Sequence, residues 1–375
     1  NFPLRPQDRG FDEVLVHGGG GVGQTPDYWG NDYFDDTYFH NGTPQKSEGY
    51  CTDVWFDAAL EFIEAHREQP FFAYIPTNAP HGPYLVDEKY SRPYHDLGIP
   101  SPRAEFYGMI TNIDENMARL RDRLLELDLE ENTILIFMTD NGTAAGMRDP
   151  GGYNAGMRAT KGSQYEGGHR VPCFFHYPAG GLVGGRDVDQ LSAHVDILPT
   201  LTDLCGIDAS PQPDDLPLDG RSLAPLLKAD GQAAWPDRTL LVHSQRIEHP
   251  EKWRRSAVMT QRWRLIDGQK LFDAQADPGQ QRDVAADHRD VVSRLRSEYD
   301  AWWDSLSTRF DEYVRLELGS EANPTTLTCH DWHAPIDQVP WNQGLIERDP
   351  PANGFWAVDV STAGPCAGTI SLQSI

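Results

Sequence analysis

The sequence predicts an α/β protein, in which strands alternate with amphipathic helices around a sheet. Three features support this class. Apolar residues recur three or four positions apart in several long stretches, short apolar runs lie between those stretches, and turn-forming Gly, Pro, Asn and Asp residues separate them. With 375 residues, of which 39% are hydrophobic, the chain is long enough to bury a large core and a second, smaller unit.

The first half of the chain predicts two helices, each followed by a strand. The stretch 54–67 has the spacing of an amphipathic helix and leads into an apolar strand at 71–75. A longer helix over 102–127 carries a continuous apolar stripe and leads into a strand at 133–138. The next strand of the same sheet is expected at 171–175.

The second half predicts a smaller sheet-plus-helix unit. A helix over 192–205 is followed by a linker rich in Pro and Asp at 209–217. Strands are expected at 239–243 and 256–266, and a helix over 289–306 has its apolar residues on one side.

We therefore expect a main domain over 1–235 and an α+β subdomain over 236–312. The remainder, 313–375, is rich in Trp, Pro and Gly, with strand-like runs at 354–360 and 368–372. We interpret it as an appended β segment whose carboxyl end is cut short, because further strands would be needed to bury those runs.

The net charge of −25 excludes some partners. An acidic field repels phosphates, so nucleic acid and anionic membrane surfaces are not expected partners. No apolar run is long enough to span a membrane. The five cysteines have no regular spacing, which argues against a disulfide framework and against a zinc cage.

Two nearby motifs carry the chemistry. The expected strand 133–138 is followed by Thr139-Asp140-Asn141-Gly142, which places a carboxylate and an amide oxygen at a strand end, where α/β sheets build their sites. Such oxygens suit a hard divalent cation. The second motif runs from Lys161 through Glu166-Gly167-Gly168-His169-Arg170 to Pro172. A cation and a lysine together predict an anionic substrate, to which His169 and Arg170 would add local positive charge. His169 alternatively caps a turn.

The stretch up to Gly49 is rich in Gly, Asp, Tyr and Asn. Its glycines at 18–21 and 23 lack the Gly-Lys-Ser/Thr ending of a phosphate loop, and no strand and helix flank them as in a dinucleotide site. We interpret the stretch as a long flexible loop at the mouth of the site, where Tyr28, Trp29, Tyr33 and His40 would line a substrate pocket. A structural loop packed by its own aromatic residues is the alternative.

On these motifs the chain resembles a type I sulfatase of the alkaline-phosphatase superfamily, over about residues 11–286. Further landmarks of that family follow in the expected order: Pro80-His81-Gly82-Pro83, the run 195–201, Leu271-Phe272-Asp273 and Asp277-Pro278. The resemblance implies an alkaline-phosphatase-like fold, with a large mixed sheet flanked by helices.

The resemblance also implies residue roles. Asp140 and Asn141 would ligate a divalent cation, Ca²⁺ in the first place and Mg²⁺ as the other choice. His81 and Lys161 would contact the sulfate group and the leaving oxygen. The substrate would be an aryl or carbohydrate sulfate ester, and the location periplasmic or secreted.

One departure from the family is large. The family's nucleophile is a formylglycine made from the first residue of a Cys/Ser-x-Pro/Ala-x-Arg motif, and none of the five cysteines begins such a motif. The family's paired aspartates after an apolar strand are also absent; Asp35-Asp36 lies among aromatic residues instead, and we interpret it as loop or surface sequence. Because the chain also opens on Asn1, we expect an amino-terminally truncated sulfatase that is inactive by itself.

Three alternatives stay open. A phosphonate or phosphate ester hydrolase of the same superfamily would share Asp140 and Asn141. A non-catalytic protein that binds sulfated glycans would keep the site without turnover. A relic of a frameshifted gene would express poorly because it exposes apolar surface and unpaired strand edges.

Overall fold

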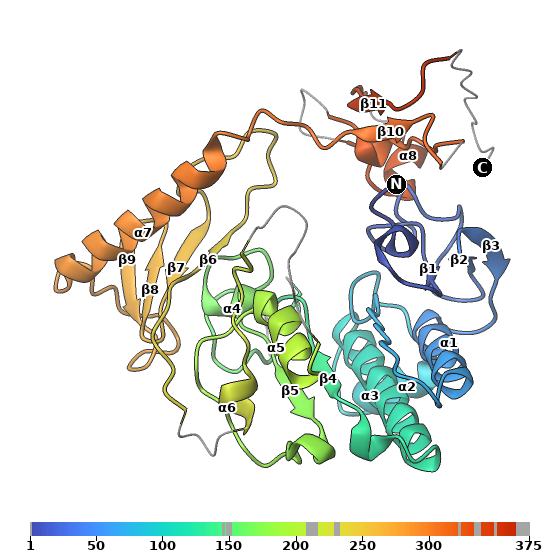
Figure 1. The fold of residues 1–375 in the computed structure, drawn as a ribbon, viewed down its shortest axis with the longest axis horizontal. Helices are drawn as coiled ribbons and strands as arrows, with labels where there is room; N and C mark the ends of the chain where they lie inside the picture. Colours follow the sequence, from blue (N-terminus) through green and yellow to red (C-terminus); the bar gives the residue numbers. More distant parts are fainter. Residues whose placement is uncertain are drawn as a thin grey trace. The chain divides into compact units, whose positions relative to one another are not determined.

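The computed structural model describes residues 2–144, 147, 152–207, 217–228, 233–321, 324–333, 339–348 and 351–364. The chain divides into two compact units (Figure 1). Unit 1 comprises residues 1–123, 247–249 and 309–375, and unit 2 comprises residues 124–246 and 250–308. Unit 1 therefore comprises the first and last stretches of the sequence, and most residues of unit 2 come between those stretches in the sequence.

Unit 1 holds an antiparallel sheet with the order β1-β2-β3, a parallel pair β10-β11, and several helices. These elements are β1 (Leu15–Val16), β2 (Thr37–His40), β3 (Thr43–Lys46), α1 (Cys51–Ala65), α2 (Glu88–Asp96), α3 (Arg103–Glu126), β10 (Leu316–Leu318), α8 (Gln343–Glu347) and β11 (Val358–Val360). The last turn of α3 belongs to unit 2.

The core of unit 1 is aromatic. Tyr33 and Tyr38, from the segment before α1, pack with Tyr50 and with Trp55 of α1, and the rings of Tyr38 and Trp55 lie 4.2 Å apart. Burying several rings in contact with one another stabilises this region well beyond what single contacts would give. The segment up to Gly49 is therefore not one flexible loop: it contains β1, β2 and β3, and two of its aromatic residues are core residues.

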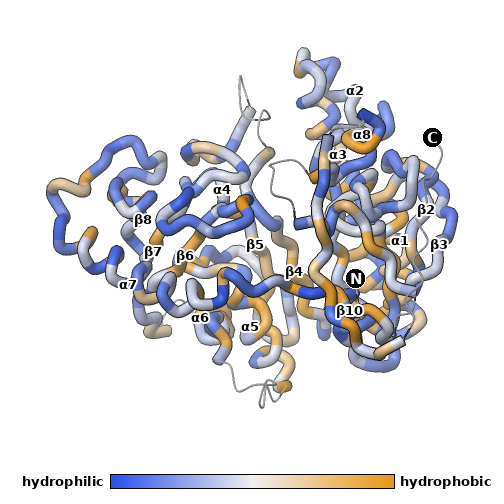
Figure 2. The backbone as a smooth tube through the Cα atoms, turned by 90° about the horizontal axis from the view of Figure 1, so that it is seen from above, coloured by the Kyte–Doolittle hydropathy of each residue, from blue (hydrophilic) through white to orange (hydrophobic). Residues whose placement is uncertain are grey.

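Unit 2 contains two sheets and the elements between them. The elements are β4 (Leu135–Met138), α4 (Glu166–His169), β5 (Cys173–His176), α5 (Ile197–Leu204), α6 (Ala224–Lys228), β6 (Leu240–His243), β7 (Ser256–Met259), β8 (Trp263–Ile266), β9 (Lys270–Asp273) and α7 (Arg289–Ser307). Strands β4 and β5 pair antiparallel, and β6-β7-β8-β9 form an antiparallel meander. Figure 2 shows hydrophobic residues along β4 and α5.

Helix α7 lies along the four-stranded sheet (Figure 1). Its side chains Leu295, Tyr299 and Trp303 are buried at positions four apart, which is one face of a helix. All residues of β7 and β8 are buried, and Trp253 stacks on Tyr299 with 3.8 Å between ring centroids. The predicted sheet-plus-helix arrangement of this region is confirmed.

Two predicted strands differ from the structure. The stretch 71–75 keeps the alternating burial of a strand, with Phe72 and Tyr74 60% and 68% exposed, but no described strand pairs with it. Without a ladder of backbone hydrogen bonds it is not a strand. The predicted strand 256–266 is instead the hairpin β7–β8, because the chain turns at Thr260, whose backbone N–H bonds back to the carbonyl of Trp263. Apolar runs alone do not reveal such a turn.

The other predicted helices and strands within the described residues are present, with ends shifted by a few residues. Residues 354–360 contain only the short strand β11, which pairs in parallel with β10. Most of the expected linker 209–217, the strand-like run 368–372 and Cys366 lie outside the described residues. The four described cysteines are free.

Candidate active site

Asp140 and Asn141 lie directly after β4, at its carboxyl end, as predicted. The pair Met138–Cys173 brings the start of β5 to the same end of the strand pair. The chain therefore leaves β4 through Asp140 and returns to that point after the segment that carries Lys161. Asp140 is exposed, and the Asn141 amide donates a hydrogen bond to its carboxylate, so that the two side chains lie together.

Backbone hydrogen bonds join this turn to the lysine segment. The N–H of Gly142 donates to the carbonyl of Gly168 at 3.1 Å, and the N–H of Lys161 donates to the carbonyl of Thr143 at 2.9 Å. A Cβ atom at Gly142 would lie 1.9 Å from the carbonyl oxygen of Gly167, so only glycine fits there. The sequence brings the two motifs together through this close approach of backbones.

Lys161 is half-buried. Within the described part of the chain, its ammonium group has no hydrogen bond and no ion pair. A partly desolvated ammonium without a carboxylate partner is available to an anion. This is what a role for Lys161 in binding sulfate requires.

Glu166 anchors the lysine segment inside unit 2. Its side chain is 2% exposed, its carboxylate accepts from Arg264 Nε of β8 at 2.5 Å, and its backbone N–H donates to Gln280 Oε1 at 2.9 Å. Burial alone would raise the pKa of Glu166, but the guanidinium of Arg264 more than offsets this, and the pKa is lowered. A glutamate beside two glycines carries no signal of its burial in the sequence, so this role of Glu166 was not expected.

The side chains of Arg158 and Gln164 also hold the same segment. The guanidinium of Arg158 lies 4.0 Å from the centre of the Tyr165 ring and donates to the carbonyl of Gln280 at 2.8 Å. Gln164 donates to Asp267 at 2.9 Å. The segment that carries Lys161 is therefore fixed to the four-stranded sheet by side chains on both sides of the lysine.

His169 and Arg170 lie at the end of this segment. His169 Nε2 donates to the carbonyl of Gln164 at 3.3 Å, and burial lowers its pKa although Glu166 acts in the opposite direction. A neutral imidazole bonded to its own segment resembles the turn-capping alternative more than a substrate contact. Arg170 is exposed and lies 3.5 Å from Glu166, so its charge is partly compensated.

His194 lies beside the Asp140 turn and was not singled out from the sequence. Its Nε2 donates to the carbonyl of Thr139 at 3.0 Å. The 55 residues that separate the two positions give no sequence signal for this contact. The next turn of chain is fixed by Asp196, which is fully buried and accepts from Arg238 Nη1 at 2.8 Å.

His81 belongs to unit 1. Its ring is exposed, and Nδ1 donates to the carbonyl of Gly82 at 2.7 Å, which leaves Nε2 as the nitrogen that faces other partners. The backbone is held by two further bonds, from Tyr33 Oη to the His81 carbonyl at 3.2 Å and from the His81 N–H to the carbonyl of Asn78. Buried Tyr33 thus fixes the segment that carries this histidine.

Tyr28 and Trp29 lie on a loop of unit 1 before β2. Tyr28 is 42% exposed and Trp29 is partly exposed, unlike Tyr33 and Tyr38 of the same region. Tyr33, which was expected to line the pocket, is 2% exposed and packs in the core of unit 1, so the aromatic residues of this region divide into core residues and surface residues. Asp35 and Asp36 lie in a loop before β2, and Asp35 is exposed, as expected. Asp36 is instead buried and accepts from Tyr38 Oη at 2.8 Å, so it is not a surface residue.

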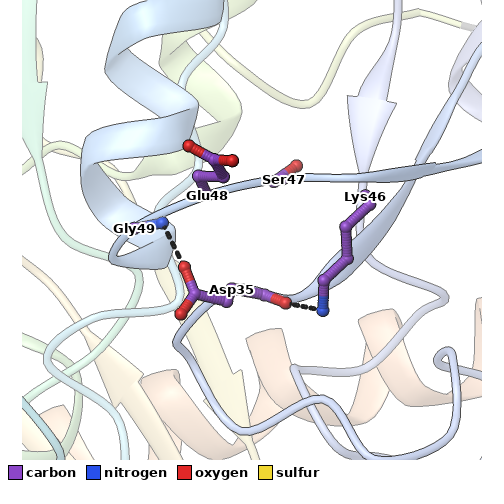
Figure 3. A pocket seen from close by; sticks show the side chains of 5 residues that line it. All are labelled: Asp35, Lys46, Ser47, Glu48 and Gly49. Carbon is purple, nitrogen blue, oxygen red and sulfur yellow. Dashed lines mark hydrogen bonds between the residues drawn. The ribbon is translucent and has the colours of Figure 1, made fainter.

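A hollow of about 710 Å³ lies where the chain enters β2 and leaves β3, at the end of this hairpin away from its turn (Figure 3). It is lined by Asp35, Lys46, Ser47, Glu48 and Gly49. Lys46 donates to the carbonyl of Asp35, and Gly49 N–H donates to the Asp35 carboxylate at 2.7 Å. Its polar groups thus bond to one another, and none of the predicted site residues lines it.

The donor atoms of Asp140 and Asn141 fit a hard cation in kind, since both offer oxygen. Ca²⁺ takes about six to eight such ligands, so these two residues supply a part of a site. Among the described residues, no cluster of three or more His, Cys, Asp or Glu side chains is placed to hold a metal ion. For formylglycine there is no matching residue at all, because the motif that would carry it is missing from residues 1–375.

Comparison with known structures defines the class. The crystal structure of Ps i-CgsB in complex with k-i-k-neocarrahexaose matches 82% of this chain and 70% of that chain, with a TM-score of 0.69 and 25% identity. The PsFucS1 sulfatase from Pseudoalteromonas sp. matches with a TM-score of 0.57 over 75% of this chain and 59% of that chain, at 18% identity. The structure is thus a mixed α/β fold of the alkaline-phosphatase-like class, as predicted.

The chain belongs to the sulfatase family, whose model "Sulfatase" matches residues 5–207. A second model, "N-sulphoglucosamine sulphohydrolase, C-terminal", matches residues 160–302. A sulfatase of Formosa agariphila is 30% identical over 54% of this chain, and human N-acetylgalactosamine-6-sulfatase is 31% identical over 49%. The chain spans 37% and 33% of the lengths of these two relatives.

The described helices include none with both the length and the apolar character needed to cross a bilayer.

Proposed function

We propose that this chain forms the cation-binding and sulfate-binding part of a sulfuric ester hydrolase that acts on a sulfated carbohydrate. The observation that carries the proposal is the backbone link from Lys161 to Thr143 at 2.9 Å, which joins the turn of Asp140 and Asn141 to a lysine whose ammonium group has no partner among the described residues. Family membership supports the reaction class. A periplasmic or secreted location, which the family resemblance implies, belongs to the same proposal.

The residues divide the work by their chemistry. Asp140 and Asn141 would hold a divalent cation, Ca²⁺ or Mg²⁺, which would neutralise sulfate oxygens when bound. Lys161 would hold a sulfate oxygen with a compact positive charge. His81, with Nε2 directed away from its Gly82 contact, would donate a proton or hydrogen bond to the leaving oxygen. Arg170 would contribute positive charge at the rim, and His169 would cap the turn beside it.

A carbohydrate substrate is the more specific part of the proposal. Ps i-CgsB was crystallised with a neocarrahexaose, and human N-acetylgalactosamine-6-sulfatase is named for a sugar. The exposed ring of Tyr28 and the partly exposed ring of Trp29 would suit a sugar face, since aromatic rings offer a large apolar contact with a polar rim. The net charge of −25 makes the local cation and Lys161 necessary for drawing in such an anion.

Residues 1–375 contain no formylglycine motif, so we propose that they bind substrate without turning it over. The test measures the affinity of k-i-k-neocarrahexaose by calorimetry with and without Ca²⁺. The same hexaose without sulfate groups is the comparison ligand. The second readout is release of sulfate from 4-nitrophenyl sulfate.

We expect Ca²⁺-dependent binding that is lost without the sulfate groups, and no release of sulfate. Lys161→Met should weaken binding at least about tenfold, the size of one lost charged hydrogen bond, whereas Lys270→Met, at an exposed lysine on β9, should not. Equal binding of the sulfated and unsulfated sugars would contradict the proposal. Tighter binding of a phosphonate ester would instead favour the phosphonate hydrolase alternative.

A further inference from the structure

The loop that carries Tyr28 and Trp29 is held from within by one glutamine, Gln343, the first residue of α8. Gln343 is 8% exposed. Its Oε1 accepts from the N–H of Gly30 at 3.0 Å. Its Nε2 donates to the carbonyl of Tyr28 at 3.2 Å. The same side chain thus bonds to the backbone on both sides of Trp29.

The amide of Gln343 also reaches the start of the loop. Its Nε2 lies 3.3 Å from the carbonyl oxygen of Gln24 and 3.4 Å from that of Asp27. One amide group therefore serves four backbone groups between residues 24 and 30. The carbonyls of Gln24 and Tyr28 also accept from the N–H groups of Asp27 and Asn31, so Gln343 matters most for the Gly30 N–H and the Asp27 carbonyl. Losing a hydrogen-bond partner away from water is costly.

The neighbours of Gln343 lie along the same loop. The N–H of Thr25 donates to the carbonyl of Trp341 at 3.0 Å, and its hydroxyl donates to the carbonyl of Pro340 at 2.6 Å. The N–H of Gln343 donates to the carbonyl of Gly23 at 3.2 Å. The segment 340–343 is thus joined to the loop by backbone as well as side-chain bonds.

Asp27 holds the loop from its other side. Its buried carboxylate accepts from the N–H of Gly18 at 2.8 Å, from the N–H of Gly23 at 2.9 Å and from the amide of Asn31 at 3.1 Å. The backbone of the loop is therefore fixed by two buried polar side chains, while the Tyr28 side chain remains exposed. A rigid backbone with projecting aromatic side chains lowers the entropy lost when a ligand binds.

We propose that Gln343 is a positioning residue for ligand binding: it fixes the backbone of residues 24–30 so that Tyr28 and Trp29 are presented to the sugar part of the substrate. The proposal rests on the proposed function for its ligand. Glutamine is required because one terminal group must both accept from Gly30 and donate to the carbonyls. Glutamate would keep the acceptor and lose the donors, and leucine would lose both.

The test uses the full 375-residue chain and two readouts. Gln343→Leu and Gln343→Glu are compared with wild type by hydrogen exchange of the amides of residues 24–30 and by calorimetry with k-i-k-neocarrahexaose in the presence of Ca²⁺. Gln69→Leu, at an exposed glutamine of unit 1, is the matched control. We expect exchange in the loop to rise and affinity to fall about tenfold in Gln343→Leu, less in Gln343→Glu, and neither in the control.

A double-mutant cycle separates positioning from a general structural effect. Trp29→Ala should weaken binding in the wild-type background and have much less effect when Gln343 is already leucine, because the loop then no longer presents the ring. Additive losses would overturn the positioning role. If hydrogen exchange of residues 24–30 is unchanged in Gln343→Leu, Gln343 does not order the loop.

The outcome also distinguishes this inference from the proposed function. If the wild-type chain fails to prefer the sulfated hexaose, the proposed function and the role of Gln343 in binding are both overturned, while hydrogen exchange still decides whether Gln343 orders the loop. If the wild-type chain binds and Gln343→Leu binds equally well, only the inference about Gln343 is overturned.

Discussion

The guanidinium of Arg264 donates to the carboxylate of Glu166 at 2.5 Å, and both side chains are almost fully buried in unit 2. This pair joins the second strand of the β7–β8 hairpin to the segment that carries Lys161. A buried charge that loses its partner is left uncompensated in a region of low polarity. The ion pair therefore anchors the segment that carries Lys161 to the four-stranded sheet.

Removing one partner of this pair should be strongly destabilising. We expect Glu166→Gln to lower the free energy of unfolding of unit 2 by about 3–5 kcal/mol, measured by urea denaturation. Arg282→Met, which removes one member of an exposed pair, should change it by less than about 1 kcal/mol. The double variant Glu166→Leu/Arg264→Met should lose much less stability than the single variants Glu166→Leu and Arg264→Met lose together, and a loss equal to their sum would contradict this account.

Because of the ion pair between Asp196 and Arg238, we expect the stability of unit 2 to fall at acid pH. Burial alone would raise the pKa of Asp196, but hydrogen bonds from Arg238 and from the N–H groups of Arg221 and Ala193 lower it below its usual value. Because the pKa is lower in the folded state, the pair contributes stability above the unfolded-state pKa of about 3.9. That contribution is lost as the pH falls from there through the lower, folded-state pKa.

The corresponding measurement is urea unfolding at several pH values between about 6 and 2.5. Wild type should lose stability steadily over the acid part of this range. Asp196→Asn should be less stable at neutral pH and show a shallower loss, whereas Asp187→Asn, at an exposed aspartate, should follow wild type. Parallel curves for wild type and Asp196→Asn would show that this carboxylate does not carry the acid sensitivity.

Gly142→Ala should disrupt the link between the two site motifs. The added methyl group would lie 1.9 Å from the carbonyl oxygen of Gly167, so the backbone must move. We expect a stability loss of about 1–3 kcal/mol, as for other overpacked sites, together with weaker binding of the sulfated hexaose. Gly279→Ala is the control, since the nearest atom to its added Cβ is the flexible end of Gln281. Wild-type affinity in Gly142→Ala would show that the turn is not needed for binding.

Substitutions of His81 and Tyr33 should affect ligand affinity and folding stability differently. His81→Ala removes an exposed ring, so we expect a stability change within about 0.5 kcal/mol and a clear loss of sulfate affinity. Tyr33→Phe removes the hydrogen bond to the His81 carbonyl and should cost about 1 kcal/mol of stability as well as affinity. Burial raises the pKa of Tyr33 to about 12, so its hydroxyl keeps its proton throughout the neutral range.

The control for this pair is His249→Ala, at another exposed histidine of unit 1, which should leave both quantities unchanged. If His81→Ala and His249→Ala bind the hexaose equally well, His81 has no part in the site.

Sequence reasoning predicted most helices, because α1, α3 and α7 carry their apolar residues at helical spacing over many turns. It also placed Asp140 and Asn141 at the end of β4. It failed at 71–75, where an apolar run has no pairing strand among the described residues, and at 256–266, where a turn interrupts an apolar run. The local hydrophobic pattern shows which secondary structure a segment prefers, whereas strand pairing depends on residues elsewhere in the chain.

The contacts that organise the candidate site lay beyond sequence reasoning for the same reason. Glu166 meets Arg264 across 98 positions, and His194 meets the turn at Thr139 across 55. A buried glutamate and an exposed one look alike in a sequence, since only the fold decides which finds a guanidinium. The division of the early aromatic residues into core and surface, Tyr33 against Tyr28, has the same origin.

Gln343 bonds to the carbonyl of Gln24 across 319 positions, and this separation bears on how the protein is made. The loop at residues 24–30 is synthesised before unit 2, but the glutamine that orders it is synthesised after the whole of unit 2. Closing so long a loop carries a large entropic cost that favourable contacts must follow. Unit 1 therefore completes its folding only after the whole of unit 2 has been translated.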